Sequence, residues 1–204
     1  MFEIETFYSR FIGMEQPPKS LMRWLHLPED KLAAVTGGAV FEDGLGEFSA
    51  IREALRRYYP ENVRIKKVAA RAAKMAQSGQ YNYGRCMRRG DTVAAMLALD
   101  EFVRQAISMV YLLNRTYMPY YKWMFRGMEK FQILPEVAEK IRELSVIGDT
   151  SEMWKPPFPP GWNPYVNQLD PRVVRIEEIC QAVVGELRKQ GLTDSRDAFL
   201  EAHT

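Results

Sequence analysis

The spacing of apolar positions along this chain is that of α-helices for most of its length. The clearest pattern covers residues 92–115, where apolar side chains recur at intervals of three and four and Asp91 stands at the N-cap position. The apolar positions are Met96, Leu99, Val103, Ala106, Val110 and Leu113. We therefore predict one long helix of the bundle type, about 36 Å long at roughly 1.5 Å per residue.

Shorter helical patterns lie on both sides of this segment. They cover residues 28–36, 48–59, 61–77, 119–130, 135–145, 172–190 and 194–203. Gly79 is expected to break or kink the helix that precedes it. We predict a mainly α fold, a helical bundle with at most one small β-hairpin, near residues 39–41 and the turn pair Asp43-Gly44.

The pattern divides the 204 residues into four predicted parts. Residues 1–45 form an N-terminal lead-in with short helices, and residues 46–150 form the core helical bundle. Residues 151–170 form a connector, and residues 171–204 supply C-terminal helices that pack on the bundle. Regular structure in the connector is opposed by Pro156, Pro157, Pro159, Pro160 and Pro164.

Composition excludes several classes of protein. Hydrophobic residues make up 47% of the chain and charged residues 26%, as in ordinary globular proteins. The longest apolar run is interrupted by Asp100, Glu101 and Arg104, so we predict no membrane span.

The two cysteines and two histidines lack the spacing of metal ligands, which argues against a zinc site. Two lone thiols favour the reducing environment of the cytosol. The acidic pair Glu42-Asp43 is common turn chemistry, and we predict no metal ligand there.

The net charge of +2 hides an uneven distribution. Residues 51–90 contain eleven lysines and arginines against two glutamates, a local charge of +9, which leaves −7 for the rest of the chain. Such a segment can attract phosphate-bearing ligands or an acidic protein face, and a solvated helix surface has the same appearance. The sequence leaves both interpretations open.

Two segments concentrate side chains suited to ligand binding, and residues 77–85 are the first. Gln80 and Asn82 offer the paired donors and acceptors that suit a base edge or a sugar hydroxyl. Tyr81 can stack on a ring, and Arg85 adds a cation. A helix kink whose polar groups satisfy one another would explain the same residues equally well.

The second segment, residues 114–123, lies where the long helix meets its successor. Arg115 offers a forked donor and Lys122 a compact charge for phosphate oxygens, next to a helix that Pro119 would open. The neighbouring candidates are Asn114, Tyr117, Tyr121 and Trp123. Some of these aromatic residues are expected to be core, but the two cations are harder to explain by packing, because a buried cation without a partner is costly.

These residues resemble the C-terminal helical domain of nucleotidyltransferase-like proteins of the kanamycin or aminoglycoside type, an uncharacterised bacterial family named domain of unknown function 4037. The resemblance is carried by Trp24-Leu25 with Pro28-Glu29, residues 40–46, Tyr58-Tyr59-Pro60, residues 79–82, residues 113–115 with Tyr117 and Pro119, and Lys122-Trp123. It implies an all-α bundle that covers a nucleotide held by a head domain. Arg115 and Lys122 would then contact phosphates, with Gln80, Tyr81 and Asn82 facing the base or the acceptor.

The head of that family carries a Gly-Ser turn and an Asp-x-Asp pair for magnesium and the triphosphate, and this chain has neither. We therefore do not expect it to catalyse nucleotidyl transfer alone. We predict a substrate- or nucleotide-binding domain that acts with a nucleotidyltransferase head. ATP and Mg²⁺ would be bound when the head is present, and the sequence does not identify the acceptor.

The alternative is a non-catalytic protein-interaction module with a basic face. The charge also permits a nucleic-acid binder, but no reading helix or stacking sheet is visible.

Overall fold

The computed structural model describes residues 3–158, 160–163 and 166–204, which form helices and no strand. The prediction of a mainly α fold is confirmed. The short strand expected at residues 39–41 does not form, because the surrounding loop is held by side chains instead of by a neighbouring strand. Arg52 donates to the carbonyl oxygens of Gly37 and Gly38, and the Asp43 carboxylate accepts from the backbone N–H of Ser49.

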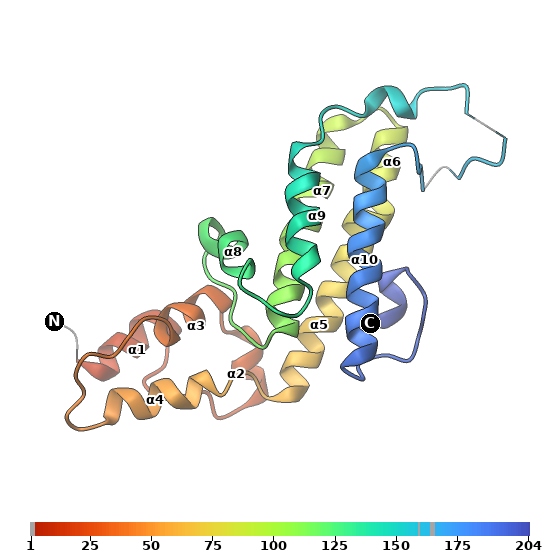
Figure 1. Ribbon diagram of the computed structural model, residues 1–204. Helices are drawn as coiled ribbons and strands as arrows, with labels where there is room; N and C mark the ends of the chain where they lie inside the picture. The colour runs from red at the N-terminus through yellow and green to blue at the C-terminus, as the bar shows by residue number, and fades with distance from the viewer. Residues whose placement is uncertain (1–2, 159, 164–165) are drawn as a thin grey trace.

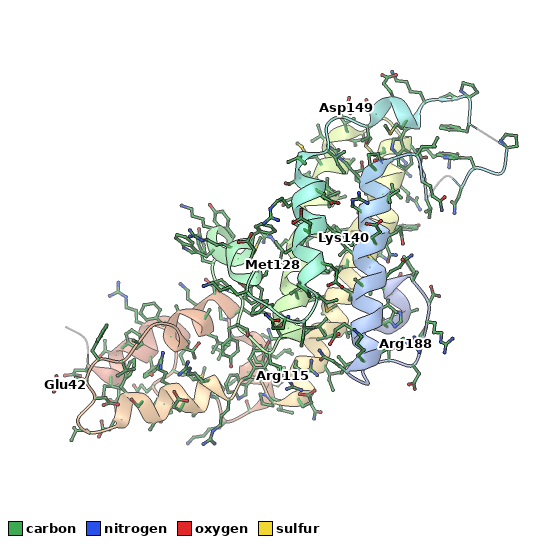
Figure 2. The ribbon with its side chains drawn as sticks, viewed as in Figure 1. Glu42, Arg115, Met128, Lys140, Asp149 and Arg188 are labelled. Atoms are coloured by element: carbon green, nitrogen blue, oxygen red, sulfur yellow. The ribbon has the colours of Figure 1, made fainter. Side chains whose placement is uncertain are left out.

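The chain has the shape of an L, with an arm that projects from the foot of an upright helical bundle (Figure 1). In the arm, α1 (Ile4–Ile12) and α4 (Glu47–Arg56) both pack on α3 (Glu29–Thr36), while α2 (Leu21–His26) packs against α5 at the joint. The boundary predicted at residue 45 therefore falls inside the arm. Figure 2 shows Glu42 at the tip of the arm and Arg115 at the joint.

The upright begins with one long rod made of three consecutive helical segments. These are α5 (Glu61–Met75), the π-helix η1 (Ala76–Tyr83) and α6 (Gly84–Arg88). The chain does not break at Gly79, but the α-helix gives way to the π-helix η1 around it, so the helix is irregular where the sequence predicted a break or kink. This glycine also serves packing, because a Cβ added there would lie 2.3 Å from Cδ2 of Phe102. The wide π-turn thus brings the rod and the next helix into close contact.

The next helix, α7 (Thr92–Leu113), returns alongside the rod. The predicted cap is present, since the Asp91 carboxylate accepts from the N–H of Ala94. The C-terminal half of α7 is buried from residue 105 to residue 113, whereas its N-terminal half keeps one face open. Met96, predicted to lie in the packing seam, is on that open face, because Ala95 and Phe102 make the buried contacts there.

The remaining elements complete the bundle. They are α8 (Tyr121–Met128), α9 (Pro135–Val146), the 3₁₀ turn η2 (Ser151–Trp154), α10 (Pro171–Lys189) and the 3₁₀ turn η3 (Leu200–His203). The helix expected from Pro119 begins two residues later, with Tyr120 as its N-cap, and the helix expected over residues 194–203 is reduced to η3. No helix among the described residues is long and apolar enough to cross a membrane.

A buried carboxylate fastens the proline-rich connector to the bundle. Asp170 is fully buried, and its Oδ2 accepts hydrogen bonds from the Tyr83 hydroxyl, the Thr150 hydroxyl and Trp154 Nε1 at 2.7 to 3.0 Å. Such a satisfied polar network fixes the path of the chain where regular backbone bonding is absent. Pro159 and Pro164 of the predicted connector lie outside the described residues.

Candidate functional site

A groove of about 460 Å³ opens at the corner of the L, where the arm meets the bundle. The residues that line it come from the start of α3, from α5 and α7, and from the segment that leads into α8. They are Leu27, Pro28, Glu29, Asp30, Lys67, Arg71, Arg104, Met118, Pro119, Tyr120, Tyr121 and Met124. The groove thus combines cations, carboxylates and aromatic rings from segments far apart in the sequence.

A three-residue charge cluster forms the floor of the groove. The Oε1 atom of Glu29 lies 3.6 Å from Nζ of Lys67 and 3.3 Å from Nη2 of Arg71. Lys67 and Arg71 are one helical turn apart on α5, so they project from the same face. Arg71 is also held by its Nε, which donates to the Ser108 hydroxyl at 2.8 Å. One largely buried carboxylate therefore serves two cations, which leaves this cluster with a net positive charge.

A buried tyrosine, Tyr59, lies beside this cluster without lining the groove. The ammonium group of Lys67 lies 4.9 Å from the centre of the Tyr59 ring, a cation–π distance. Burial lowers the pKa of Lys67, partly offset by the charge of Glu29. The hydroxyl of Tyr59 is buried and finds no hydrogen-bond partner among the described residues, which costs free energy.

Two further features make the groove suitable for an anion. Arg104 is exposed on α7 and forms no ion pair with any described residue, so the lining holds three cations against the two carboxylates of Glu29 and Asp30. The groove also receives the N-terminal ends of α3 and α8, neither of which has a side-chain cap. Free N–H groups at a helix start attract anions, and here they act together with the cations.

An aromatic rim flanks the cations. The rings of Tyr120 and Tyr121 lie 4.6 Å apart, and both side chains are more than half exposed. Met118 and Met124 supply adaptable apolar surface beside them. A flat ring can pack on this rim while an attached phosphate reaches Arg71 and Arg104. In the described part of the chain, no group of histidine, cysteine, aspartate or glutamate residues is arranged to hold a metal ion.

No side chain of the first predicted segment, residues 77–85, lines the groove. Both hydrogens of the Gln80 amide are donated, to Glu177 and to the carbonyl of Ala198, and its oxygen accepts from the N–H of Leu200. Gln80 therefore joins η1 to α10 and to the C-terminal segment. Arg85 lies over the ring of Tyr81 and donates to its hydroxyl, while Asn82 is exposed. Ligand contacts by these four residues stay predictions, and none of the four lines the groove.

The second predicted segment is divided between two places. Arg115 pairs with Glu61 at 2.9 Å and lies in a different, shallow hollow that also contains Asn114. Asn114 clamps the backbone of Ile133, and the buried Tyr117 donates to the carbonyl of Leu55.

Of this second segment, the predicted residue that reaches the groove is Tyr121. Lys122 and Trp123 are exposed on α8 beside the groove without lining it, and Lys122 forms no ion pair with any described residue. The structure therefore does not gather Arg115 and Lys122 at one hollow, and phosphate contacts by either residue stay predictions.

The basic segment, residues 51–90, does not form one open cationic face. Six of its cations are engaged in ion pairs inside the chain, namely Arg52, Arg56, Arg64, Lys67, Arg71 and Lys74. Arg64 is almost fully buried and binds Glu61 through both Nε and Nη2. Glu53 and Glu61 belong to the segment itself, while Glu29 on α3 and Glu101 on α7 are the two partner carboxylates that come from other elements.

Sequence reasoning missed the three cations of the groove. A signal was nevertheless present, since Lys67 and Arg71 are four residues apart in a helical pattern and Arg104 interrupts the longest apolar run. What the sequence could not supply is the position of Glu29 and of the Tyr120-Tyr121 pair, which depends on how the arm meets the bundle.

The geometry defines an all-helical domain with an anion-suited groove at its corner. Residues 24–124, from within α2 to within α8, match the family described as Domain of unknown function (DUF4037). This match supports the part of the resemblance that concerns this domain. Every residue that lines the groove falls inside the matched segment. The chain matches no curated protein and no solved structure.

Proposed function

We propose that this chain is a helical domain that binds a phosphate-bearing ligand with an aromatic ring, a nucleotide such as ATP, and presents it to a nucleotidyltransferase head. The observation that supports the proposal is the groove, in which Lys67, Arg71 and Arg104 surround a floor with excess positive charge next to the Tyr120-Tyr121 rim. In this proposal the head supplies the chemistry of transfer, since its Gly-Ser turn and Asp-x-Asp pair have no counterpart in this sequence.

The proposal is tested by calorimetric titration of ATP into the chain, with and without Mg²⁺ and with and without a head protein encoded beside this gene. Arg104→Ala is the informative variant, because Arg104 is exposed and forms no ion pair with any described residue. We expect it to weaken ATP binding about tenfold, which corresponds to about 1.4 kcal/mol. The matched control is Arg188→Ala, an exposed position on α10 away from the groove (Figure 2). Absence of binding in every combination would remove the nucleotide from the proposal.

A second candidate function is a protein-interaction module without a ligand. It predicts that the cations singled out from the sequence are paired with local carboxylates, and Arg115 is paired in this way with Glu61. Lys122 and Arg104 do not follow that expectation within the described residues. Equal ATP affinity of the wild type, Arg104→Ala and Arg188→Ala would favour this second function.

A further inference from the structure

Exposed apolar side chains gather at both ends of the L. At the tip of the arm, Phe41 is 99% exposed and Leu45 is 85% exposed, with Val40 beside them. We call these three residues the tip patch. At the far end of the upright, Val93, Met96 and Leu97 on α7 are between 64% and 67% exposed and occupy one helical face. We call these the α7 patch. Single exposed apolar residues are ordinary, but clustered ones indicate an interaction surface.

The tip patch is held in place and is acidic. Buried Arg52 binds the carbonyls of Gly37 and Gly38 at one end of the loop, and Asp43 caps α4 through the N–H of Ser49 at 2.7 Å at the other. Residues 32–51 contain Glu42, Asp43 and Glu47 and no lysine or arginine, and the one cation bonded to the loop, Arg52, is buried beneath it. The loop therefore presents Phe41 and Leu45 on an ordered, negatively charged support, which favours a basic partner surface.

The α7 patch has the opposite charge at its edge. Arg88 and Arg89 stand at the turn before α7, are exposed, and form no ion pair with any described residue. The N-terminus of the 22-residue helix α7 adds a partial positive charge. The acid beside them, Asp91, is engaged in capping Ala94. The edge of the α7 patch next to the turn is therefore complementary to the tip patch in polarity and charge, while Asp100, one turn after Met96 on the same face, places an exposed carboxylate at the other edge.

The α7 patch lies on the side of the upright from which the arm projects. Arg104 lies two turns after Leu97 on the same face of α7, and it lines the groove together with Asp30 of the arm. The α7 patch therefore looks into the angle of the L, and the arm that carries the tip patch bounds that same angle (Figure 1). The patches lie at the ends of the two limbs of the L, so they do not meet within one chain.

We propose that two copies of this chain associate about a two-fold axis, with the tip patch of each copy seated on the α7 patch of the other. Two L-shaped molecules related in this way close on themselves, which is the commonest symmetry of protein oligomers. The closed pair contains this contact twice, and a stable interface buries roughly 800 Å² per partner. Both grooves then lie inside the closed pair. This inference stands independently of the nucleotide.

The first test is the mass of the full chain by sedimentation velocity over a concentration series. We expect a reversible monomer–dimer equilibrium that Phe41→Ala and Leu97→Ser each weaken at least tenfold. Phe41 and Leu97 are exposed, so neither change threatens the fold, and far-UV circular dichroism verifies this. The matched control is Val146→Ala at the end of α9, where an equally exposed apolar residue belongs to neither patch.

A mixing experiment separates this arrangement from other modes of self-association. Glu42→Lys alone and the double variant Arg88→Glu/Arg89→Glu alone are expected to be monomeric, because each places like charges together. In a mixed dimer, the lysine introduced at position 42 of one copy faces the two introduced glutamates of the other copy. At the second contact, the native Glu42 of the second copy faces the native Arg88 and Arg89 of the first. Mixing the two variants should therefore restore the dimer. A wild-type chain that stays monomeric to about 100 µM, roughly the weak end of specific association, overturns the inference. A dimer that the patch variants leave intact also overturns it, and so does a mixture that stays monomeric. If Phe41→Ala dimerises with unaltered affinity but no longer binds a head protein, the tip patch is the binding surface for the head instead.

Discussion

The carboxylate of Glu29 on α3 lies 3.3 Å from the guanidinium of Arg71 on α5, and this ion pair joins the arm to the bundle at the floor of the groove. The same carboxylate oxygen is 3.6 Å from the ammonium of Lys67. Glu29 therefore has two roles, since it links the two limbs of the L and it occupies the cations that an anionic ligand would use.

Glu29→Gln is expected to separate these roles. Because the change removes a largely buried counter-charge from two cations, the free energy of unfolding should fall by about 1–3 kcal/mol. The affinity for ATP should rise several-fold, because the ligand phosphates no longer compete with a fixed carboxylate. Urea unfolding and calorimetry measure the two effects. Asp30→Asn, in the same groove but without an ion pair among the described residues, serves as the control that should leave stability within about 0.5 kcal/mol. Weaker ATP binding in Glu29→Gln would contradict this account of the floor.

Gln80 is expected to matter for stability. Gln80→Ala removes two donors and one acceptor from a buried site and leaves the partly buried Glu177 without its amide partner, while burial already raises the pKa of that carboxyl. The expected loss is about 1–3 kcal/mol of unfolding free energy. Gln77→Ala, one turn earlier and exposed, should cost less than about 0.5 kcal/mol. Equal stability of the two variants would show that the amide network contributes little.

Gly79 and Gly185 offer a matched pair of helical glycines. A Cβ at position 79 would lie 2.3 Å from the Phe102 ring, so Gly79→Ala should destabilise the bundle by about 1–3 kcal/mol through forced displacement of α7. A Cβ at position 185 meets nothing within 4 Å, and Gly185→Ala should stabilise α10 by about 0.5–1 kcal/mol through helix propensity. Thermal and urea unfolding measure both. A neutral Gly79→Ala would mean that α7 does not pack on the π-turn as closely as the structure shows.

The ion pairs of Glu61 predict an acid-dependent loss of stability. Hydrogen bonds from Arg64, then from Arg115, lower the pKa of the Glu61 carboxyl to about 2 from its ordinary value of 4.5. Because the folded-state pKa is the lower one, the contribution is fully present above about pH 4.5 and is lost as the pH falls toward 2. The Glu61 side chain is 46% exposed, so solvent screening limits the effect to about 1 kcal/mol.

The measurement is the unfolding free energy of the wild type and of Glu61→Gln at pH 6 and pH 3. The difference between the two proteins should shrink at the lower pH. Glu15→Gln, at an exposed position outside the helices and without an ion pair among the described residues, is the matched control, because it removes a carboxylate that has no such partner. A Glu61→Gln difference that is constant with pH would show that the carboxylate charge does not stabilise the fold.

The sequence was informative where one segment determines its own structure. The apolar spacing and the Asp91 cap located α7 within two residues, and the helical pattern over residues 172–190 located α10 within one residue at each end. It failed where distant segments decide the outcome. Gly79 looks like a helix breaker by propensity, but the sequence did not show that the nearby Phe102 ring leaves room only for a glycine in the π-helix there.

The candidate site shows the same limit. Arg115 and Lys122 are close in sequence and were paired on that basis, yet Arg115 turns to Glu61 at the joint while Lys122 stays exposed on α8. The cations that do converge, Lys67, Arg71 and Arg104, belong to two helices whose register the sequence alone does not give. Tyr121 is the residue predicted from the sequence that lines the groove with them.

The most direct measurement of the central claim is the nuclear magnetic resonance spectrum of the arginine Nε–Hε groups during addition of ATP, with signals assigned by single Arg→Lys variants. If the groove holds the phosphates, the signals of Arg71 and Arg104 shift with one common dissociation constant, while those of Arg115 and Arg188 stay in place. If the signal of Arg115 shifts while Arg71 and Arg104 do not, or if no arginine signal responds at millimolar ATP, the groove is not the phosphate site.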